Sequence, residues 1–252
     1  MSMLEIENLS VEPADGGQRI LNNVNLTVDF GYTNVLFGPN GSGKSALLRA
    51  IMGFGDYKVV EGRILFNGED ITNLSVDERA EKGLGIMLQR PPNMTGVKLS
   101  SLIKAIAKEN MDIDKVAEDL DMKRFMDREI NVGFSGGEIK RSELLQLIAQ
   151  NPCMYLIDEP ESGVDLVSIN KVGTKIQEML NANLECIGER SVKGKSALII
   201  THTGQILDYL EADRAYIMCS GKIMCSGNPR KLLDEIKTQG YEECIRCKLN
   251  QI

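Results

Sequence analysis

A glycine-rich segment, residues 38–45, constrains what this chain can fold into more than any other stretch. It reads Gly-Pro-Asn-Gly-Ser-Gly-Lys-Ser and matches the phosphate-binding loop pattern G-x-x-x-x-G-K-[ST]. The apolar residues 35–37 before it predict a short buried strand, and residues 46–52 after it contain no Gly or Pro and predict a helix. The alternative is a turn that only joins a strand to a helix. A full match in a strand–loop–helix context favours phosphate binding.

The residue types in this loop explain how it would hold a nucleotide. Glycines let the backbone curl so that successive N–H groups point at phosphate oxygens, and the helix N-terminus adds partial positive charge. We expect Lys44 to reach the β- and γ-phosphates and the Ser45 hydroxyl to bind Mg²⁺. The predicted ATP-binding residues are Gly38, Pro39, Asn40, Gly41, Ser42, Gly43, Lys44, Ser45 and Ala46.

Length and composition limit the class of protein. The chain has 252 residues, of which 42% are hydrophobic, enough for one large α/β domain or a core with a small subdomain. No apolar run reaches the roughly 18 residues of a membrane span, and the N-terminus lacks the pattern of a signal peptide. A net charge of −7 argues against a nonspecific nucleic-acid binder. We therefore expect a cytoplasmic protein that does not insert into membranes and binds no nucleic acid.

The hydrophobic pattern along the chain predicts an α/β fold. Residues 4–11 and 20–28 alternate apolar and polar side chains, which indicates two half-buried strands before the phosphate-binding loop. Such an antiparallel start excludes a small GTPase. Between residues 99 and 150 the apolar positions have helical spacing. Further strands are predicted at residues 62–68, 85–88, 154–157, 197–200 and 215–218, with a hairpin around Gly221 and helices at 76–82 and 232–237.

Two carboxylates end a predicted buried strand. Residues 154–157 are apolar and are followed by Asp158 and Glu159. In a protein with a phosphate-binding loop, such an acid holds Mg²⁺, and the next one could accept a proton from an attacking water. The alternative is that both acids only cap the strand where it meets solvent. Their place at the end of a strand that follows the loop favours the catalytic interpretation.

A second glycine-rich turn, Ser135-Gly136-Gly137-Glu138, precedes a predicted helix at residues 139–150. Free N–H groups at such a helix start could bind an anion, although alone the turn reads as a helix cap. The order of motifs decides between these readings. The chain resembles the ABC-type ATPases in the order of its motifs. This order is the phosphate-binding loop, Gln89, the Ser-Gly-Gly turn, Asp158-Glu159, Ser162-Gly163-Val164-Asp165 and His202, a histidine after a strand.

The resemblance covers about residues 3 to 235 and implies both fold and roles. It implies a RecA-like core with an antiparallel β subdomain, formed by residues 1–89 and 152–252, and a helical subdomain at 90–151, all within one domain, 1–252. Gln89 and Asp158 would hold Mg²⁺ together with Ser45. Glu159 would be the base and His202 would orient the γ-phosphate and water. Ser135, Gly136, Gly137 and Glu138 would close over the nucleotide of a facing subunit, and Asp165 would link the two sites.

Within that family the sequence looks most similar to the SufC-type ATPases of the SUF iron–sulfur cluster assembly system. The resemblance rests on residues 134–141 (Phe-Ser-Gly-Gly-Glu-Ile-Lys-Arg), on 56–62 (Asp-Tyr-Lys-Val-Val-Glu-Gly), on 89–92 with 96–97, and on 201–207. Residues 11–20 contain no aromatic to stack on adenine, which is also typical of that group, so any base contact there would be aliphatic. Ala46, where Thr is usual, and Pro160-Glu161 depart from the pattern.

The resemblance implies an ATPase that powers conformational change in a SUF-type scaffold complex, as a transient homodimer on ATP binding, with SufB-like and possibly SufD-like partners. Two alternatives remain: the ATPase subunit of a membrane ABC transporter, and a nonenzymatic ATP-binding clamp, which Glu159 and His202 argue against. A partner-docking groove is expected beside Gln89. Lys140 and Glu161 are candidates for resting-state ion pairs.

The six cysteines are expected to be reduced thiols, because the chain is long and carries no export signal. Cys153, Cys219 and Cys225 adjoin apolar runs and are expected to behave as small core residues. Cys244-Ile245-Arg246-Cys247 is a C-x-x-C pair without a second pair or a nearby His. A metal site needs about four ligands, so tail cysteines without a special role are favoured over a metal or redox site within one chain.

Overall fold

A central six-stranded sheet carries the predicted site in this computed structural model, which describes residues 2–108, 111–182, 189 and 194–241. The strand order is β12-β11-β3-β10-β9-β6, parallel except for β12. The strands are β3 (Thr33–Phe37), β6 (Leu84–Met87), β9 (Met154–Asp158), β10 (Ser196–Ile200), β11 (Arg214–Cys219) and β12 (Lys222–Gly227). Because parallel strands end at one edge, the segments after β3, β6, β9 and β10 meet there.

An antiparallel sheet packs against this core in the order β2-β1-β4-β5. Its strands are β1 (Ser2–Pro13), β2 (Leu21–Asp29), β4 (Tyr57–Phe66) and β5 (Glu69–Asp70). The two predicted N-terminal strands are confirmed. Strand β4 begins five residues earlier than the predicted start at Gly62, so that Tyr57 pairs with Pro13. Gly62 has φ of 82°, and a Cβ there would lie 2.4 Å from the Glu7 carbonyl oxygen, which explains glycine at this bend.

The central sheet is buried on both faces by two separate hydrophobic clusters. Leu36 of β3 faces the antiparallel sheet and helix α1 (Lys44–Met52). Its neighbours Val35 and Phe37 point the other way, into a cluster that contains the helical part of the chain. Strand β3 is therefore apolar at every position from 35 to 37 because each side chain enters one of two cores.

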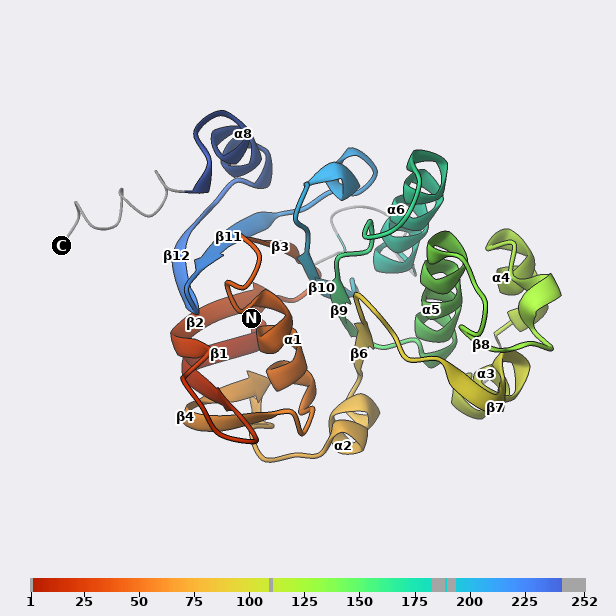
Figure 1. The fold of residues 1–252 in the computed structure, drawn as a ribbon, viewed down its shortest axis with the longest axis horizontal. Coiled ribbons are helices and arrows are strands. Elements are labelled where there is room, and N and C mark those ends of the chain that lie inside the picture. The colour runs from red at the N-terminus through yellow and green to blue at the C-terminus, as the bar shows by residue number, and fades with distance from the viewer. Residues whose placement is uncertain (1, 109–110, 183–188, 190–193, 242–252) are drawn as a thin grey trace.

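The helical part lies at the side of the core sheet away from β1, β2 and β4 (Figure 1). It contains α3 (Leu99–Ile106), α4 (Ile113–Asp119), the short 3-10 helix η1 (Lys123–Phe125) and α5 (Gly136–Gln150). Leu144 and Leu145 of α5 join the same cluster as Phe37 and Tyr155, so this part continues the core. A two-stranded ladder, β7 (Met94–Lys98) with β8 (Glu129–Ile130), was not predicted from the sequence.

Three of the remaining helices connect strands, and the last one follows the final strand, β12. They are α2 (Val76–Glu81), α6 (Leu166–Leu180), the 3-10 helix η3 (Gln205–Asp208) and α8 (Pro229–Gln239). Ser75 forms a capping box with Glu78 at the start of α2, which confirms the predicted N-cap. Helix α6 was not predicted. Strands β11 and β12 form the hairpin expected around Gly221.

Neither a membrane span nor a metal cluster appears in the described part of the chain. No described helix is long and apolar enough to cross a bilayer. Among the described residues, no group of three or more His, Cys, Asp or Glu side chains is placed to hold a metal ion. Cys153, Cys219 and Cys225 form no disulfide bond within the described part of the chain; Cys219 is buried as expected, whereas Cys153 and Cys225 are only partly buried. The Cys244–Cys247 pair lies outside the described residues.

Candidate nucleotide-binding and catalytic site

A cavity of about 410 Å³ opens over the glycine-rich loop. Most of the predicted loop residues line it, from Asn40 to Ala46, and Gln89 and Glu159 join them from the ends of β6 and β9. Two further lining residues, Ile20 and Tyr57, come from the antiparallel sheet region. The cavity therefore unites the phosphate-binding loop with two of the predicted metal-binding and catalytic residues.

Close packing explains the glycines at both ends of the loop. Gly38 has φ of 157°, and a Cβ there would lie 2.2 Å from the Met218 carbonyl oxygen. Gly43 has φ of 103° and immediately precedes helix α1. A side chain at Gly38 would displace the β11 backbone, so the loop can take this shape only with glycine at that position.

Lys44 is folded back over its own loop. Its ammonium donates hydrogen bonds to the carbonyl oxygens of Gly38 at 2.7 Å and Pro39 at 3.0 Å. Burial lowers the pKa of Lys44, and the nearby carboxylates Glu159 and Asp158 partly offset this effect. A phosphate in the cavity would supply the missing negative charge, so the loop is prepared for an anionic ligand.

Asp158 has the properties of a magnesium ligand. It ends β9, is 4% exposed, and its Oδ1 atom has no hydrogen-bond partner. Burial raises the pKa of its carboxyl group, and a hydrogen bond from the Ser45 hydroxyl lowers it. A buried carboxylate oxygen without a partner is costly unless a cation or donor meets it. Ser45 and Asp158 together thus fit the oxygen donors that Mg²⁺ requires.

Glu159 and Gln89 contact each other at the cavity wall. The Gln89 side-chain amide donates a hydrogen bond of 2.5 Å to Glu159 Oε2. The Glu159 backbone is left-handed, with φ of 45°, a conformation that costs about 1–3 kcal/mol for a residue other than glycine. Its amide donates to the Ile200 carbonyl at 3.0 Å, which ties the turn after β9 to β10. The carboxylate that follows this turn lines the cavity.

His202 is exposed and does not line the cavity. The residue before it, Thr201, is fully buried and donates a short hydrogen bond to Glu161 Oε1. Burial raises the pKa of Glu161, and the Thr201 hydroxyl lowers it. The expectation of an ion pair at Glu161 was therefore wrong: this acid is buried and bound to hydroxyl groups rather than exposed and paired with a cation.

The second glycine-rich turn, residues 135–138, which we call the signature turn, lies outside the cavity of its own chain. Ser135 caps α5, and a capping box joins it to Glu138. Gly136 packs so closely on the Ser162–Asp165 segment that a Cβ there would lie 2.0 Å from the Gly163 carbonyl oxygen. Asp165 accepts hydrogen bonds from the Ser168 backbone and hydroxyl at 3.0 and 2.8 Å. The two segments form one surface, which we call the signature surface, and it is separate from the glycine-rich loop.

Two buried charged residues of α5, Lys140 and Glu143, form hydrogen bonds to the segment that carries Gln89. The Lys140 ammonium donates to the carbonyl oxygens of Leu88 at 2.9 Å and Gln89 at 3.0 Å, and it lies 3.9 Å from Glu143 Oε2. The Leu88 amide donates to Glu143 Oε1 at 3.1 Å. Burial raises the pKa of Glu143 to about 7 and lowers that of Lys140, so desolvation outweighs their mutual attraction.

Sequence reasoning missed Ile20, Tyr57 and Glu143. Ile20 places an aliphatic side chain at the cavity, whereas Tyr57 adds an aromatic ring that was not expected there. The signal for Tyr57 was an aromatic in a stretch that pairs with β1, and that register is not visible in the sequence. Glu143 could have been suspected as an acid among apolar helix positions, three residues after Lys140.

Comparison with known proteins agrees with this geometry. The family model for "ABC transporter" matches residues 21–162. A "Probable ABC transporter ATP-binding protein" of Streptococcus pyogenes serotype M18 is 38% identical, over 96% of this chain and 94% of that protein. A "Probable ATP-dependent transporter" of Cyanidium caldarium, ycf16, is 35% identical, over 96% of each chain.

Solved structures show the same architecture. The crystal structure of a nucleotide-free ATP-binding cassette from an ABC transporter superposes with a TM-score of 0.75 and 26% identity, over 97% of this chain and 98% of that chain. The ADP conformation of another cassette, MJ1267, gives a TM-score of 0.75 and 27% identity over the same shares.

Proposed function

The chain belongs to the ABC transporter family of ATP-binding proteins, and from this premise we propose that it hydrolyses ATP to power conformational change in a SUF-type iron–sulfur scaffold complex. ATP binding and hydrolysis follow from the family. The observation that supports the SUF assignment is the resemblance of residues 134–141 to the SufC-type ATPases. Within that segment, Lys140 is buried against the carbonyl oxygens of Leu88 and Gln89.

The chemistry at the cavity is divided among a few side chains. Lys44 and the loop amides bind the phosphates, and Ser45, Gln89 and Asp158 would hold Mg²⁺, which supplies charge neutralisation for the phosphoryl group when bound. Glu159 accepts the proton of the attacking water. Its hydrogen bond to the Gln89 amide leaves the other amide atom, the oxygen, free for the metal. His202 orients the γ-phosphate once the active unit has formed.

The active unit is a pair of chains with two nucleotides between them. In one chain the signature residues Ser135–Glu138 do not line the cavity, although the family resemblance assigns them to a nucleotide. The turn at Ser135 is capped within its own chain, and it packs against the segment that ends at Asp165. A facing copy can present this surface to the open cavity. One chain would then supply the phosphate-binding loop of a site and the other chain its signature residues.

A groove next to the Gln89 segment would receive the partner protein. It has a volume of about 260 Å³ and is lined by residues of β6, α3 and α5: Ile86, Leu102, Ile106, Glu143, Gln146, Leu147 and Gln150. Glu143 links its wall to the Leu88 amide, and Leu88 is followed by Gln89, which contacts Glu159. A partner in this groove is thereby two hydrogen-bonded steps from the catalytic carboxylate.

Copurification tests the partner assignment. The tagged chain would be purified from its native cells, and its stable companion identified by mass spectrometry. A SufB-like or SufD-like β-helical protein is expected, and its addition should raise ATP turnover. Replacement of the groove residue Ile106 with Glu should abolish this stimulation but leave basal turnover unchanged. An integral membrane companion in the same groove would instead establish the transporter ATPase.

The paired arrangement has its own test. Ser135→Arg places a bulky cation at the proposed interface without touching the chain's own cavity. We expect this variant to bind ATP with unchanged affinity and to lose hydrolysis, because the facing site cannot close. Titration calorimetry and phosphate release measure the two properties. Normal turnover by Ser135→Arg would contradict the sandwich arrangement.

A further inference from the structure

The cavity has two ends, which lie on opposite sides of the glycine-rich loop. Glu159 and Gln89 follow β9 and β6, on one side of β3 in the sheet order. Ile20 lies on the other side, because its carbonyl oxygen contacts Gly221 in the β11–β12 turn: a Cβ on Gly221 would lie 2.1 Å away from it. The phosphate chain therefore runs toward Glu159, and the rest of the nucleotide toward Ile20 and Tyr57.

Tyr57 is held in position by three neighbouring segments. Its Cα partner in the sheet is Pro13 of β1. The preceding residue, Asp56, accepts a hydrogen bond of 2.9 Å from the Ala14 amide through its carbonyl oxygen. The Asp56 carboxylate also lies 2.6 Å from the Arg49 guanidinium of helix α1, which begins at the phosphate-binding loop. The backbone that carries the ring is thus tied to the helix that follows the loop before any ligand arrives.

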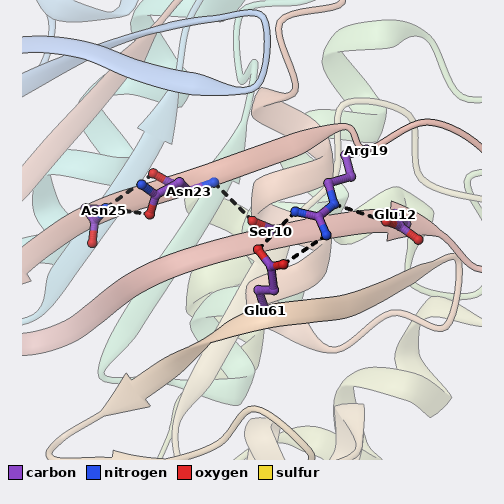
Figure 2. Close-up of polar contacts among 6 residues, drawn as sticks. All are labelled: Ser10, Glu12, Arg19, Asn23, Asn25 and Glu61. Carbon is purple, nitrogen blue, oxygen red and sulfur yellow. Dashed lines mark hydrogen bonds and ion pairs between the residues drawn. The ribbon is translucent and has the colours of Figure 1, made fainter.

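Arg19, the residue before Ile20, is held by ion pairs to two strands of the antiparallel sheet (Figure 2). The Arg19 guanidinium donates to Glu61 of β4 at 2.9 and 3.0 Å and to Glu12 of β1 at 3.2 Å. The Ile20 amide donates to the Val11 carbonyl at 2.9 Å. Exposed ion pairs add little stability, but a two-sided clamp sets the path of the loop that carries Ile20.

We propose that Tyr57 is the aromatic platform on which the base of the nucleotide stacks, with Ile20 as the aliphatic contact beside it. The β1–β2 connection, residues 14–20, offers no aromatic side chain, and the whole chain contains no Trp. Tyr57 is half-buried and lines the cavity, so one part of its surface is available to a ligand. A planar base satisfies that surface by stacking, which is tolerant of base identity because every base has a π-face.

The test separates base contacts from phosphate contacts. Titration calorimetry would compare ADP with inorganic tripolyphosphate, which lacks the base, on the full chain and its variants. Tyr57→Ala should weaken ADP binding about tenfold and leave tripolyphosphate binding unchanged. Tyr57→Phe, which keeps the ring, should bind both as the wild type does. Tyr32→Ala, which removes an exposed tyrosine that does not line the cavity, is the matched control.

Two results would overturn the proposal. One is wild-type ADP affinity in Tyr57→Ala. The other is an equal loss of ADP and tripolyphosphate affinity, which would mean that the ring only supports the loop. Should Tyr57→Ala fail to fold, the wild-type chain still decides the matter. The fluorescence of a 2-aminopurine nucleoside diphosphate should be quenched on binding, because its base would stack on Tyr57. Binding without quenching would contradict the stacked geometry.

Discussion

The signature turn packs closely against the segment that ends at Asp165 because Gly136 has no Cβ. Gly136 has a φ outside the left-handed region, so its role is close approach rather than backbone freedom. A methyl group at this position would lie 2.0 Å from the Gly163 carbonyl oxygen, and one of the two segments would have to move. The positions of Ser135 and Asp165 at the proposed interface therefore depend on this glycine.

We predict that Gly136→Ala binds ATP normally and loses most of its hydrolysis, because the interface surface shifts while the cavity does not. Overpacking of this kind costs about 1–3 kcal/mol of unfolding free energy, so the fold should survive. Nucleotide affinity, phosphate release and thermal unfolding measure these effects. Gly55→Ala is the control, since a Cβ there meets nothing within 4 Å. Wild-type turnover in Gly136→Ala would show that this contact does not position the signature turn.

A second residue-scale property concerns the opposite edge of the sheet, far from the cavity in the fold. The Lys195 ammonium donates a hydrogen bond of 2.9 Å to the Tyr155 hydroxyl. It also donates to Asn151 Oδ1, at the end of α5. Burial, together with the charge of Lys108, lowers its pKa from 10.5 to about 8. The folded chain therefore releases this proton at lower pH than the unfolded chain.

We predict that this lysine makes stability rise with pH between about 8 and 10. In that range the unfolded chain still binds the proton and the folded chain does not, so unfolding takes up protons. The full pKa difference corresponds to about 3 kcal/mol, and solvent screening of the half-buried ammonium reduces the expected gain to about 1–2 kcal/mol. Urea unfolding of the wild type and Lys195→Met at about pH 7 and pH 9.5 gives the difference. An identical pH dependence in both proteins would contradict the prediction.

At the scale of elements, α5 holds the Gln89 segment through the buried Lys140–Glu143 pair. Each partner shifts toward its neutral form because burial outweighs attraction. The pair therefore contributes position rather than net stability, and the position it sets is that of Leu88 and Gln89. The helix that begins with the signature turn thus also controls the residue that contacts Glu159.

A double-mutant cycle tests this role. Lys140→Met and Glu143→Leu should each cost about 3–5 kcal/mol of unfolding free energy, because each leaves one buried charged group without its partner. The double variant should lose less than the sum, since both charges are gone. Turnover should fall in all three, because the Gln89 segment is released. Additive losses would mean that the two residues act independently, and unchanged turnover would separate the pair from the site.

The elements that were predictable are those whose own sequence carries a period, a short apolar run or a cap. Strand β2 alternates buried and exposed side chains, and Ser75 and Glu78 form the capping box at the start of α2. Strands β7 and β8 were missed because β7 is almost entirely exposed and has no buried face to show alternation. Helix α6 contains Gly173, whose Cβ would lie 2.6 Å from Tyr209, so a tertiary contact placed a poor helix former there.

The same distinction holds for the site. Residues 38–45, Asp158 and Glu159 could be predicted because each belongs to a short local sequence motif. Tyr57 could not, because it reaches the cavity through its register with Pro13, which lies far away in the sequence. The distance of Ser135 from its own cavity could not be derived from the residues alone either, because only the family resemblance points to a second chain.

At the scale of the whole molecule, the cavity and the signature surface are separate parts of one chain. In a pair related by two-fold symmetry, each site would combine the loop of one copy with the signature turn of the other. A chain with a damaged loop would then still donate a working signature turn. A chain with a damaged signature turn would still offer a working loop. This separation of parts allows a mixing experiment that a single-chain site would not.

We predict that two inactive variants regain activity when mixed. Lys44→Ala removes the phosphate-binding ammonium, and Ser135→Arg blocks the signature surface, so each alone should be inactive. In a mixed pair, the loop of Ser135→Arg faces the signature turn of Lys44→Ala, which restores one of two sites. Random pairing of equal amounts makes about half of the pairs mixed, so about a quarter of wild-type turnover should return if the two sites act independently. A mixture of Lys44→Ala with Lys44→Ala/Ser135→Arg contains no intact loop and serves as the control. If the first mixture stays as inactive as this control, the two halves of the site do not come from different chains.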